Sequence, residues 1–245
     1  MKQSDIINVI SKCQTEFEKN LRNKKIMFIY ENKNRTLDKY EVYFPKNTFY
    51  HLTGIKAFDK YNKLLNSYNF YEILQKNRIN EMKIKVKDST TYYKLEVLPQ
   101  LMRIDKMANM VGNFASYGLV LQTDKLIGNV NACMGFIKDS DLNMYIPNTA
   151  LKEDIRNITD ERKRIVAILK KDINENLYKN ITYLKNNYCI EDILKNQEIN
   201  KNIDISNIYS ADKKIDEKIY NFFYKENNID VVEDIQFEDD EDLDM

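Results

Sequence analysis

Residues 110–147 read MVGNFASYGLVLQTDKLIGNVNACMGFIKDSDLNMYIP, and this stretch decides the fold class. Four of the five glycines of the chain lie in it, and they separate short apolar runs. Short apolar runs punctuated by glycine and asparagine are typical of β-strands joined by turns. We therefore expect three strands, over 117–122, 129–138 and 142–147, in an antiparallel meander.

Helical patterns and one hairpin precede this stretch. Apolar side chains recur at helical spacing from Ile6 to Leu21. Two strand-like runs within 24–44 flank Asn32-Lys33-Asn34, which predicts a hairpin. The elements expected before residue 110 are a helix over 5–21, this hairpin, a short helix capped at Asn47 or Thr48 that ends near Gly54, and helices over 57–76 and 90–107.

The chain changes character after the meander. We expect a short helix over 151–158, a strand over 164–171, and helical pieces over 176–187, 189–196 and 211–226. The predicted fold class is α+β, with N-terminal helices packed on an antiparallel meander sheet and a helical C-terminal appendage. The predicted domains are an α+β domain over 1–175, the helical appendage over 176–230, and a disordered acidic tail over 231–245.

Composition excludes several classes of protein. The longest apolar runs of the 245-residue chain, such as Ile26–Tyr30, have five residues, whereas a membrane span needs about 20. The charged N-terminal residues contain no apolar signal core. Three distant cysteines suit a reducing cytoplasm. A single histidine is too few for the usual zinc sites, so we expect no metal and no cofactor.

The net charge of zero conceals an uneven distribution. Residues 231–245 hold eight acids and no base, so the rest of the chain carries a charge of +8. The excess lies in 22–100, which holds 16 bases and 8 acids. Such a segment favours a phosphate-bearing partner, and the alternative is an ordinary lysine-rich surface. The acidic residues could cover the basic segment as a built-in mimic of nucleic acid, or could serve solubility alone.

Four polar motifs lie where strands meet turns. They are Phe49-Tyr50-His51-Leu52-Thr53-Gly54-Ile55, Lys125-Leu126-Ile127-Gly128-Asn129, Cys133-Met134-Gly135-Phe136, and Pro147-Asn148-Thr149 continuing to Lys152-Glu153-Asp154-Ile155-Arg156. Over about residues 20–175, this set resembles the phage-associated barnase–EndoU–colicin–RelE-like nucleases of mobile elements in low-GC bacteria. The resemblance implies a small α+β fold and RNA cleavage as the activity.

The resemblance also implies a set of site residues. Cleavage of RNA without a metal needs a base for the 2′-hydroxyl, an acid for the leaving 5′-oxygen and cations near the phosphorus. With one histidine in the chain, the second proton-transfer group must be a Lys, Glu or Tyr. The residues expected to be catalytic are His51, Lys125, Thr149 and Lys152, and those expected to bind substrate are Asn148 and Arg156.

Each of these residues also has a structural interpretation. His51 could simply pack beside its aromatic and aliphatic neighbours, and Asn148 or Thr149 could cap a helix. Lys152 and Arg156 have the spacing of one solvated helix face.

We therefore expect a cytoplasmic protein without membrane contact, whose partner is a nucleic acid, RNA more than DNA. Two functions stay open for it. One is an endoribonuclease. The other is a non-catalytic counter-defence or nucleic-acid-binding factor that blocks a host defence or inhibitor protein.

Overall fold

Strand β1 (Lys24–Glu31) is buried on both faces, because its centre is the apolar run from Ile26 to Tyr30. In the computed structural model, which describes residues 1–115 and 121–226, this strand pairs antiparallel with β2 on one side and with β9 on the other. Side chains alternate along a strand, so Ile26 and Phe28 face one core cluster while Met27 and Ile29 face another.

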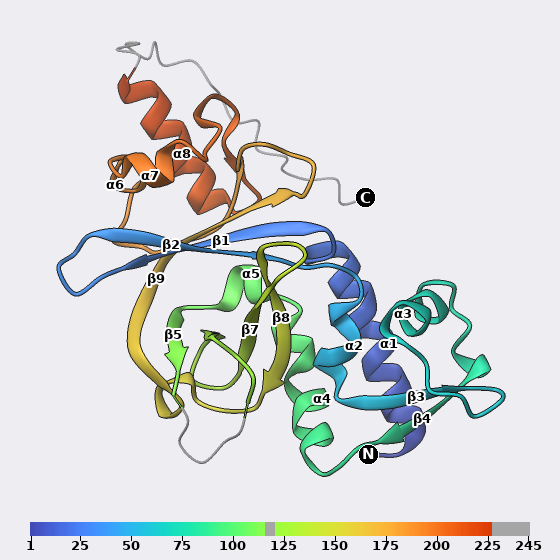
Figure 1. Ribbon diagram of the computed structural model, residues 1–245. Helices are drawn as coiled ribbons and strands as arrows, with labels where there is room; N and C mark the ends of the chain where they lie inside the picture. The colour runs from blue at the N-terminus through green and yellow to red at the C-terminus, as the bar shows by residue number, and fades with distance from the viewer. Residues whose placement is uncertain (116–120, 227–245) are drawn as a thin grey trace, which may run out of the picture.

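Seven strands close into a barrel around this strand (Figure 1). They pair in the order β1-β2-β8-β7-β6-β5-β9, and β9 returns to β1. The pairing of β2 with β8 is parallel and the other pairings in the ring are antiparallel. The other six barrel strands are β2 (Leu37–Tyr43), β5 (Met110–Phe114), β6 (Lys125–Gly128), β7 (Cys133–Asp139), β8 (Met144–Leu151) and β9 (Thr159–Asp172).

Helices lie on two sides of the barrel (Figure 1). On one side α1 (Gln3–Asn20), α2 (Thr48–Thr53), α3 (Ser67–Gln75) and α4 (Thr90–Leu101) stand beside a separate hairpin of β3 (Ile55–Asp59) and β4 (Met82–Val86), and α5 (Ile104–Met107) follows α4. On the other side β10 (Asn180–Leu184) and β11 (Tyr209–Ser210) extend the sheet from β9 and carry α6 (Ile190–Leu194), α7 (Gln197–Asn200) and α8 (Lys213–Glu226).

The larger core cluster fills the barrel and continues into the N-terminal helices. Phe28 from β1 and Phe136 from β7 belong to it, as do Phe17 of α1 and Phe49 of α2. Aromatic rings connect these parts, since the ring of Phe44 lies 6.0 Å from that of Phe136 and 6.5 Å from that of Phe17. The helices are thus packed against the same core as the barrel interior.

The predicted fold class is wrong, because the sheet is a closed barrel and not an antiparallel meander with the N-terminal helices packed on it. Neighbouring strands from β5 to β8 do pair antiparallel, but the N-terminal hairpin enters the same sheet and closes it into a barrel. Closure removes the sheet edges that an open meander would expose. The helix expected over 176–187 is also wrong, because residues 180–184 form β10.

Other expectations need smaller changes. The helix expected over 57–76 is β3 followed by the shorter α3, and the helix expected over 151–158 is reduced to a 3₁₀ turn at Ile155–Asn157. Most of the strand expected over 117–122, and the acidic residues 231–245, lie outside the described residues. Within the described parts of the chain, no helix has the length and apolar character needed to cross a membrane.

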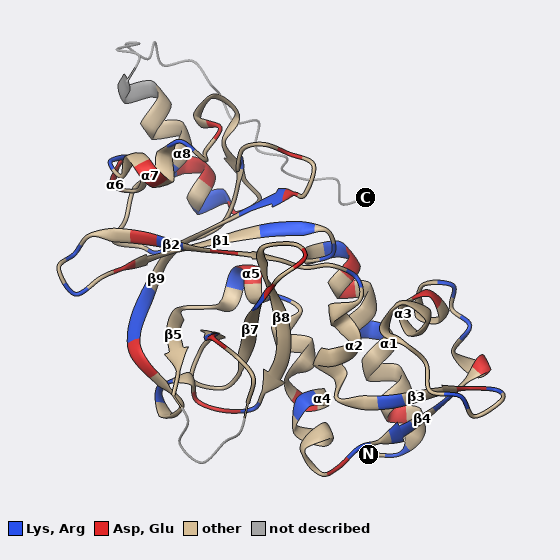
Figure 2. Ribbon diagram, in the orientation of Figure 1, with Lys and Arg blue, Asp and Glu red and all other residues tan. Residues whose placement is uncertain are grey.

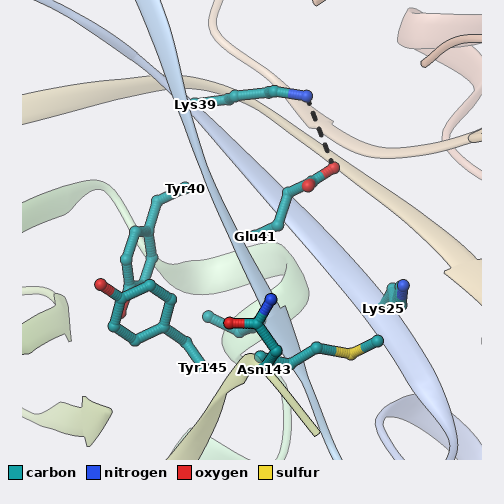
Figure 3. Close-up of a pocket in the computed structure, with 8 residues that line it drawn as sticks. Lys25, Lys39, Tyr40, Glu41, Asn143 and Tyr145 are labelled. Atoms are coloured by element: carbon teal, nitrogen blue, oxygen red, sulfur yellow. Dashed lines mark ion pairs between the residues drawn. The ribbon is translucent and has the colours of Figure 1, made fainter. Parts of the chain in front are cut away.

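The seam between β2 and β8 is the sparsest part of the ring. Its one paired position joins Val42 to Tyr145. A cleft of about 280 Å³ lies at this seam. The rings of Tyr40 and Tyr145 lie side by side there (Figure 3), and their centroids are 4.6 Å apart. On the other side of β2, Lys39 pairs with Glu41 at 3.7 Å. The contact between these two rings therefore adds to closure at the seam where strand pairing is sparsest.

Replacing Phe28 with Ala tests the importance of the barrel core. Phe28 is 0% exposed, and loss of such a ring costs about 3–5 kcal/mol of unfolding free energy. Chemical denaturation should therefore show a large loss for Phe28→Ala. Tyr61→Ala removes a ring that is 78% exposed and should change the unfolding free energy by less than about 0.5 kcal/mol. Equal losses in the two variants would contradict a core centred on β1.

Candidate functional site

A cleft of about 480 Å³ lies where α2, the start of α4 and β8 come together. Three of the residues predicted from the sequence line it, namely His51, Asn148 and Thr149. Lys94 of α4 lines it as well. The cleft therefore combines an imidazole, an ammonium group, an amide and a hydroxyl contributed by three separate elements.

Burial of one side of α2 determines the position of His51. Phe49 and Leu52, three residues apart, are both 0% exposed and belong to the larger core cluster. Residues at this spacing share one face of a helix, so His51, which lies between them in sequence, is left on the exposed side. Thr48 closes the first turn by donating its hydroxyl to the carbonyl oxygen of Pro45 at 2.7 Å.

Gly54 ends α2 and makes room for Lys94. Its φ of +68° lies in the left-handed region, which a glycine adopts without steric cost. A Cβ at this position would stand 2.8 Å from Cδ of Lys94. The hydroxyl of Thr91 donates to the carbonyl oxygen of Gly54 at 2.9 Å. The absence of a side chain at Gly54 thus lets α4 approach the end of α2 and brings Lys94 into the cleft.

Lys94 is the charged group at the centre of the cleft. Its Nζ donates to Oγ1 of Thr149 on β8 at 3.1 Å. Burial lowers the pKa of Lys94 below its ordinary 10.5, the neighbouring cation Lys87 lowers it further, and Asp88 opposes the change. An ammonium group with a lowered pKa gives up its proton more readily than an ordinary lysine.

The pKa of His51 is lowered, as that of Lys94 is. Although His51 lies on the exposed side of α2, the cleft partly desolvates its imidazole and lowers its pKa below the ordinary 6.5, and the positive charge of Lys94 lowers this pKa further. His51 is accordingly neutral at pH 7 and able to accept a proton. The cleft thus holds an imidazole and an amine close enough for the charge of Lys94 to shift the pKa of His51.

The other charged side chains that line the cleft are mostly cations. Lys56 and Lys87 line it, and Asp88 is the one carboxylate among the described lining residues. That carboxylate accepts hydrogen bonds from the backbone N–H and the hydroxyl of Thr90 at the start of α4. Asn148 donates its side-chain N–H to the carbonyl oxygen of Gln122. This balance of charge suits an anionic substrate.

The structure places the other three predicted residues outside the described lining of this cleft. Lys125 donates to Oδ1 of Asn113 at 2.7 Å, and its Nζ lies 5.3 Å from the ring centroid of Tyr40. Burial lowers the pKa of Lys125, and Lys163 lowers it further. Lys152 pairs with Glu96 at 2.5 Å, and Arg156 pairs with Asp154 at 2.6 Å. The roles expected for these three residues stay predictions.

Lys94 and Thr91 are the site residues that sequence reasoning missed. Because the chain has a single histidine, the sequence indicated that the second proton-transfer group is a Lys, Glu or Tyr. It did not indicate where in the chain that residue lies. No local motif marks Lys94, because its contact with Gly54 spans 40 positions of the chain. A search for metal ligands finds no group of three or more His, Cys, Asp and Glu side chains suited to an ion among residues 1–115 and 121–226.

Comparison with protein-family models places the chain in a class of nuclease-like proteins. The family model described as "phage-Barnase-EndoU-ColicinE5/D-RelE like nuclease4" matches residues 9–187, and the chain belongs to this family. The resemblance inferred from the motifs is thereby confirmed, and the family indicates a nucleic acid as the substrate. Neither the curated proteins nor the solved structures gave a match.

The coupling of His51 to Lys94 can be measured directly, because His51 is the one histidine of the chain. Proton NMR of its imidazole across a pH series should give a pKa below 6.5. Lys94→Gln removes the neighbouring positive charge, so the pKa of His51 should rise. Lys138→Gln, which removes an exposed lysine elsewhere, should leave it unchanged. An unaltered His51 pKa in Lys94→Gln would contradict the electrostatic contact.

Proposed function

We propose that this protein cleaves RNA without a metal ion at the cleft that holds His51 and Lys94. The observation that carries the proposal is the shared cleft, in which a histidine and a lysine both have lowered pKa values and the lysine contacts Thr149. Family membership supports a nucleic acid as the substrate. The choice of RNA follows from the chemistry that these side chains can perform.

His51 acts as the general base in this proposal. It takes the proton of the ribose 2′-hydroxyl, and the freed oxygen attacks the adjacent phosphorus. The bond from phosphorus to the 5′-oxygen breaks, and Lys94 gives a proton to that oxygen. The products are a 2′,3′-cyclic phosphate and a 5′-hydroxyl. Water then restores the proton to Lys94 and removes it from His51, so charge and atoms balance.

The other polar groups hold the phosphate. The hydroxyl of Thr149 and the amide of Asn148 lie on β8, where they can donate to a non-bridging phosphate oxygen. The cations Lys56 and Lys87 add attraction for the substrate and for the charge that develops on the phosphorus. Because Lys94 already contacts Thr149, a phosphate bound by Thr149 also meets the proton donor.

The chemistry of the lining residues supports a metal-independent reaction. Mg²⁺ and Ca²⁺ bind oxygen ligands, above all carboxylates. In the described lining, Asp88 is the one carboxylate, and it accepts hydrogen bonds from Thr90. In this proposal, the positive charges of lysine side chains stabilise the transition state in place of a metal ion. Activity measured with and without a chelator tests this point, and loss of activity with the chelator would contradict it.

His51→Ala should lower the rate of RNA cleavage by about 10²–10⁴-fold, because it removes the general base. Lys94→Ala should lower it to a similar degree. Cleavage of a labelled single-stranded RNA is the measurement, and thermal midpoints should show that both variants fold. Lys12→Ala, an exposed lysine on α1 that lies away from the described lining, serves as the control and should keep full activity.

The pH dependence of kcat/KM should form a bell. His51 must be neutral, so the rate falls as the pH drops through a pKa below 6.5. Lys94 must be protonated, so the rate also falls as the pH rises through a pKa below 10.5. In Lys94→Arg the cation keeps its proton to higher pH, and the alkaline limb should move upward. An alkaline limb that stays in place would mean that another group donates the proton.

The alternative function is a non-catalytic factor that binds nucleic acid or blocks a partner protein. It shares the fold and the cationic cleft, and it predicts binding of RNA without cleavage. Mass spectrometry of RNA after incubation separates the two functions, because cyclic phosphate ends that depend on His51 arise only by catalysis. Intact RNA with unchanged binding in His51→Ala would favour the alternative.

A further inference from the structure

A second concentration of positive charge lines a groove that shares no described lining residue with the His51 cleft. This groove of about 1000 Å³ runs between the end of α1, α5, β10 and the start of α8. Among the described residues that line it, Asp212 is the one acid. The lysines that line it are Lys19, Lys106, Lys170, Lys213, Lys214 and Lys218. Figure 2 shows the end of α8 next to the sheet in blue.

A neighbouring cleft continues this groove. It has a volume of about 420 Å³ and is lined by Arg156, Arg164 and Lys185. Tyr183 of β10 lines both, so the two adjoin at this residue, and we call them together the β10 groove. None of its basic residues lies in 22–100, where the sequence has its positive excess. Folding therefore gathers a cationic surface from segments that are each balanced in charge.

Most of these lysines are available to a ligand. Lys19, Lys106, Lys213 and Lys214 are exposed, and none forms an ion pair within the described residues. Lys170 instead stabilises the floor of the groove, since its Nζ contacts Oδ2 of Asp105 at 2.5 Å and the carbonyl oxygen of Asn20 at 3.2 Å. Unpaired cations along a groove attract a polyanion by releasing the counterions of both partners.

One aromatic side chain, Tyr183, indicates which class of polyanion fits the groove. The ring of Tyr183 is partly buried at the junction of the two clefts, with Arg164 close enough to influence the pKa of its hydroxyl. An aromatic ring beside an arginine is a platform on which a base can stack.

We propose that the β10 groove binds single-stranded nucleic acid, with its phosphates on the lysines of α5 and α8 and a base against Tyr183. The groove is separate from the His51 cleft, as the two share no described lining residue. In this proposal, the C-terminal elements help to hold the nucleic-acid strand. Binding in the β10 groove does not depend on catalysis at His51.

A single-stranded DNA oligonucleotide is the probe that keeps the two sites apart. DNA lacks the 2′-hydroxyl, so it cannot be consumed by the reaction proposed at His51. Binding to the full-length protein is followed by fluorescence anisotropy of a labelled 20-mer at several salt concentrations. K213E/K214E reverses two charges of the groove, and K12E/K138E reverses two exposed charges elsewhere and has the same net charge.

We expect K213E/K214E to weaken binding at least tenfold more than K12E/K138E at low salt. Each lost phosphate contact lowers the salt dependence by about 0.7 in the slope of log K against log salt, so two contacts lower it by about 1.4. Tyr183→Leu should weaken binding, and Tyr183→Phe should retain it, because stacking needs the ring and not the hydroxyl. Circular dichroism should show that every variant folds.

Equal affinity and equal salt slope in K213E/K214E and K12E/K138E would overturn the proposal. It would also fail if these substitutions weakened binding only in a chain that ends at residue 230. That result would mean that the acidic residues 231–245 occupy the groove of the full-length protein. Failure of RNA cleavage, by contrast, would leave binding of DNA in the β10 groove unaffected, so the two proposals can fail independently.

Discussion

The double burial of β1 is the constraint on which the rest of the structure depends. A strand with apolar side chains on both faces has to be covered twice, and with neighbours on both edges its backbone groups are also paired. The barrel interior and the N-terminal helices cover one face, while the C-terminal elements cover the other. Each layer of the molecule is thereby defined by which face of β1 it shields from water.

The position of the candidate site follows from the same constraint. Phe49 and Leu52 place α2 against the larger core cluster, and Leu95 and Leu98 place α4 there. The polar sides of these two helices are then held together at Gly54, where Lys94 passes across the end of α2. Proximity of this kind lets the positive charge of Lys94 lower the pKa of His51. Core packing and the electrostatics of the cleft are therefore two results of one arrangement.

Local features of the fold could be predicted from the sequence. Apolar spacing over a few turns is enough for α1, and a turn between two β-branched runs is enough for the hairpin of β1 and β2. The helix α2 was expected for a similar reason, since a polar cap precedes it and a glycine follows it. His51, Asn148 and Thr149 were proposed from motifs and line one cleft.

Closure of the barrel could not be predicted in this way. It depends on the pairing of Val42 with Tyr145, residues that lie over a hundred positions apart with no local pattern to connect them. The five residues of β10 are too few for their period to separate a strand from a turn of helix. Lys94 was missed because its importance comes from the contact with Gly54 and Thr149 and not from its neighbours in sequence.

The core cluster on the outer face of β1 extends beyond the part of the chain that matches the family. The family match ends at residue 187, but this cluster joins Met27 and Ile29 to Ile193, Ile219 and Phe222, which lie beyond that point. A chain cut at the end of the match would leave an apolar wall of the barrel in contact with water. The segment inherited with the family is thus shorter than the unit that this chain folds, and comparison by the match alone would overlook the part that covers the wall.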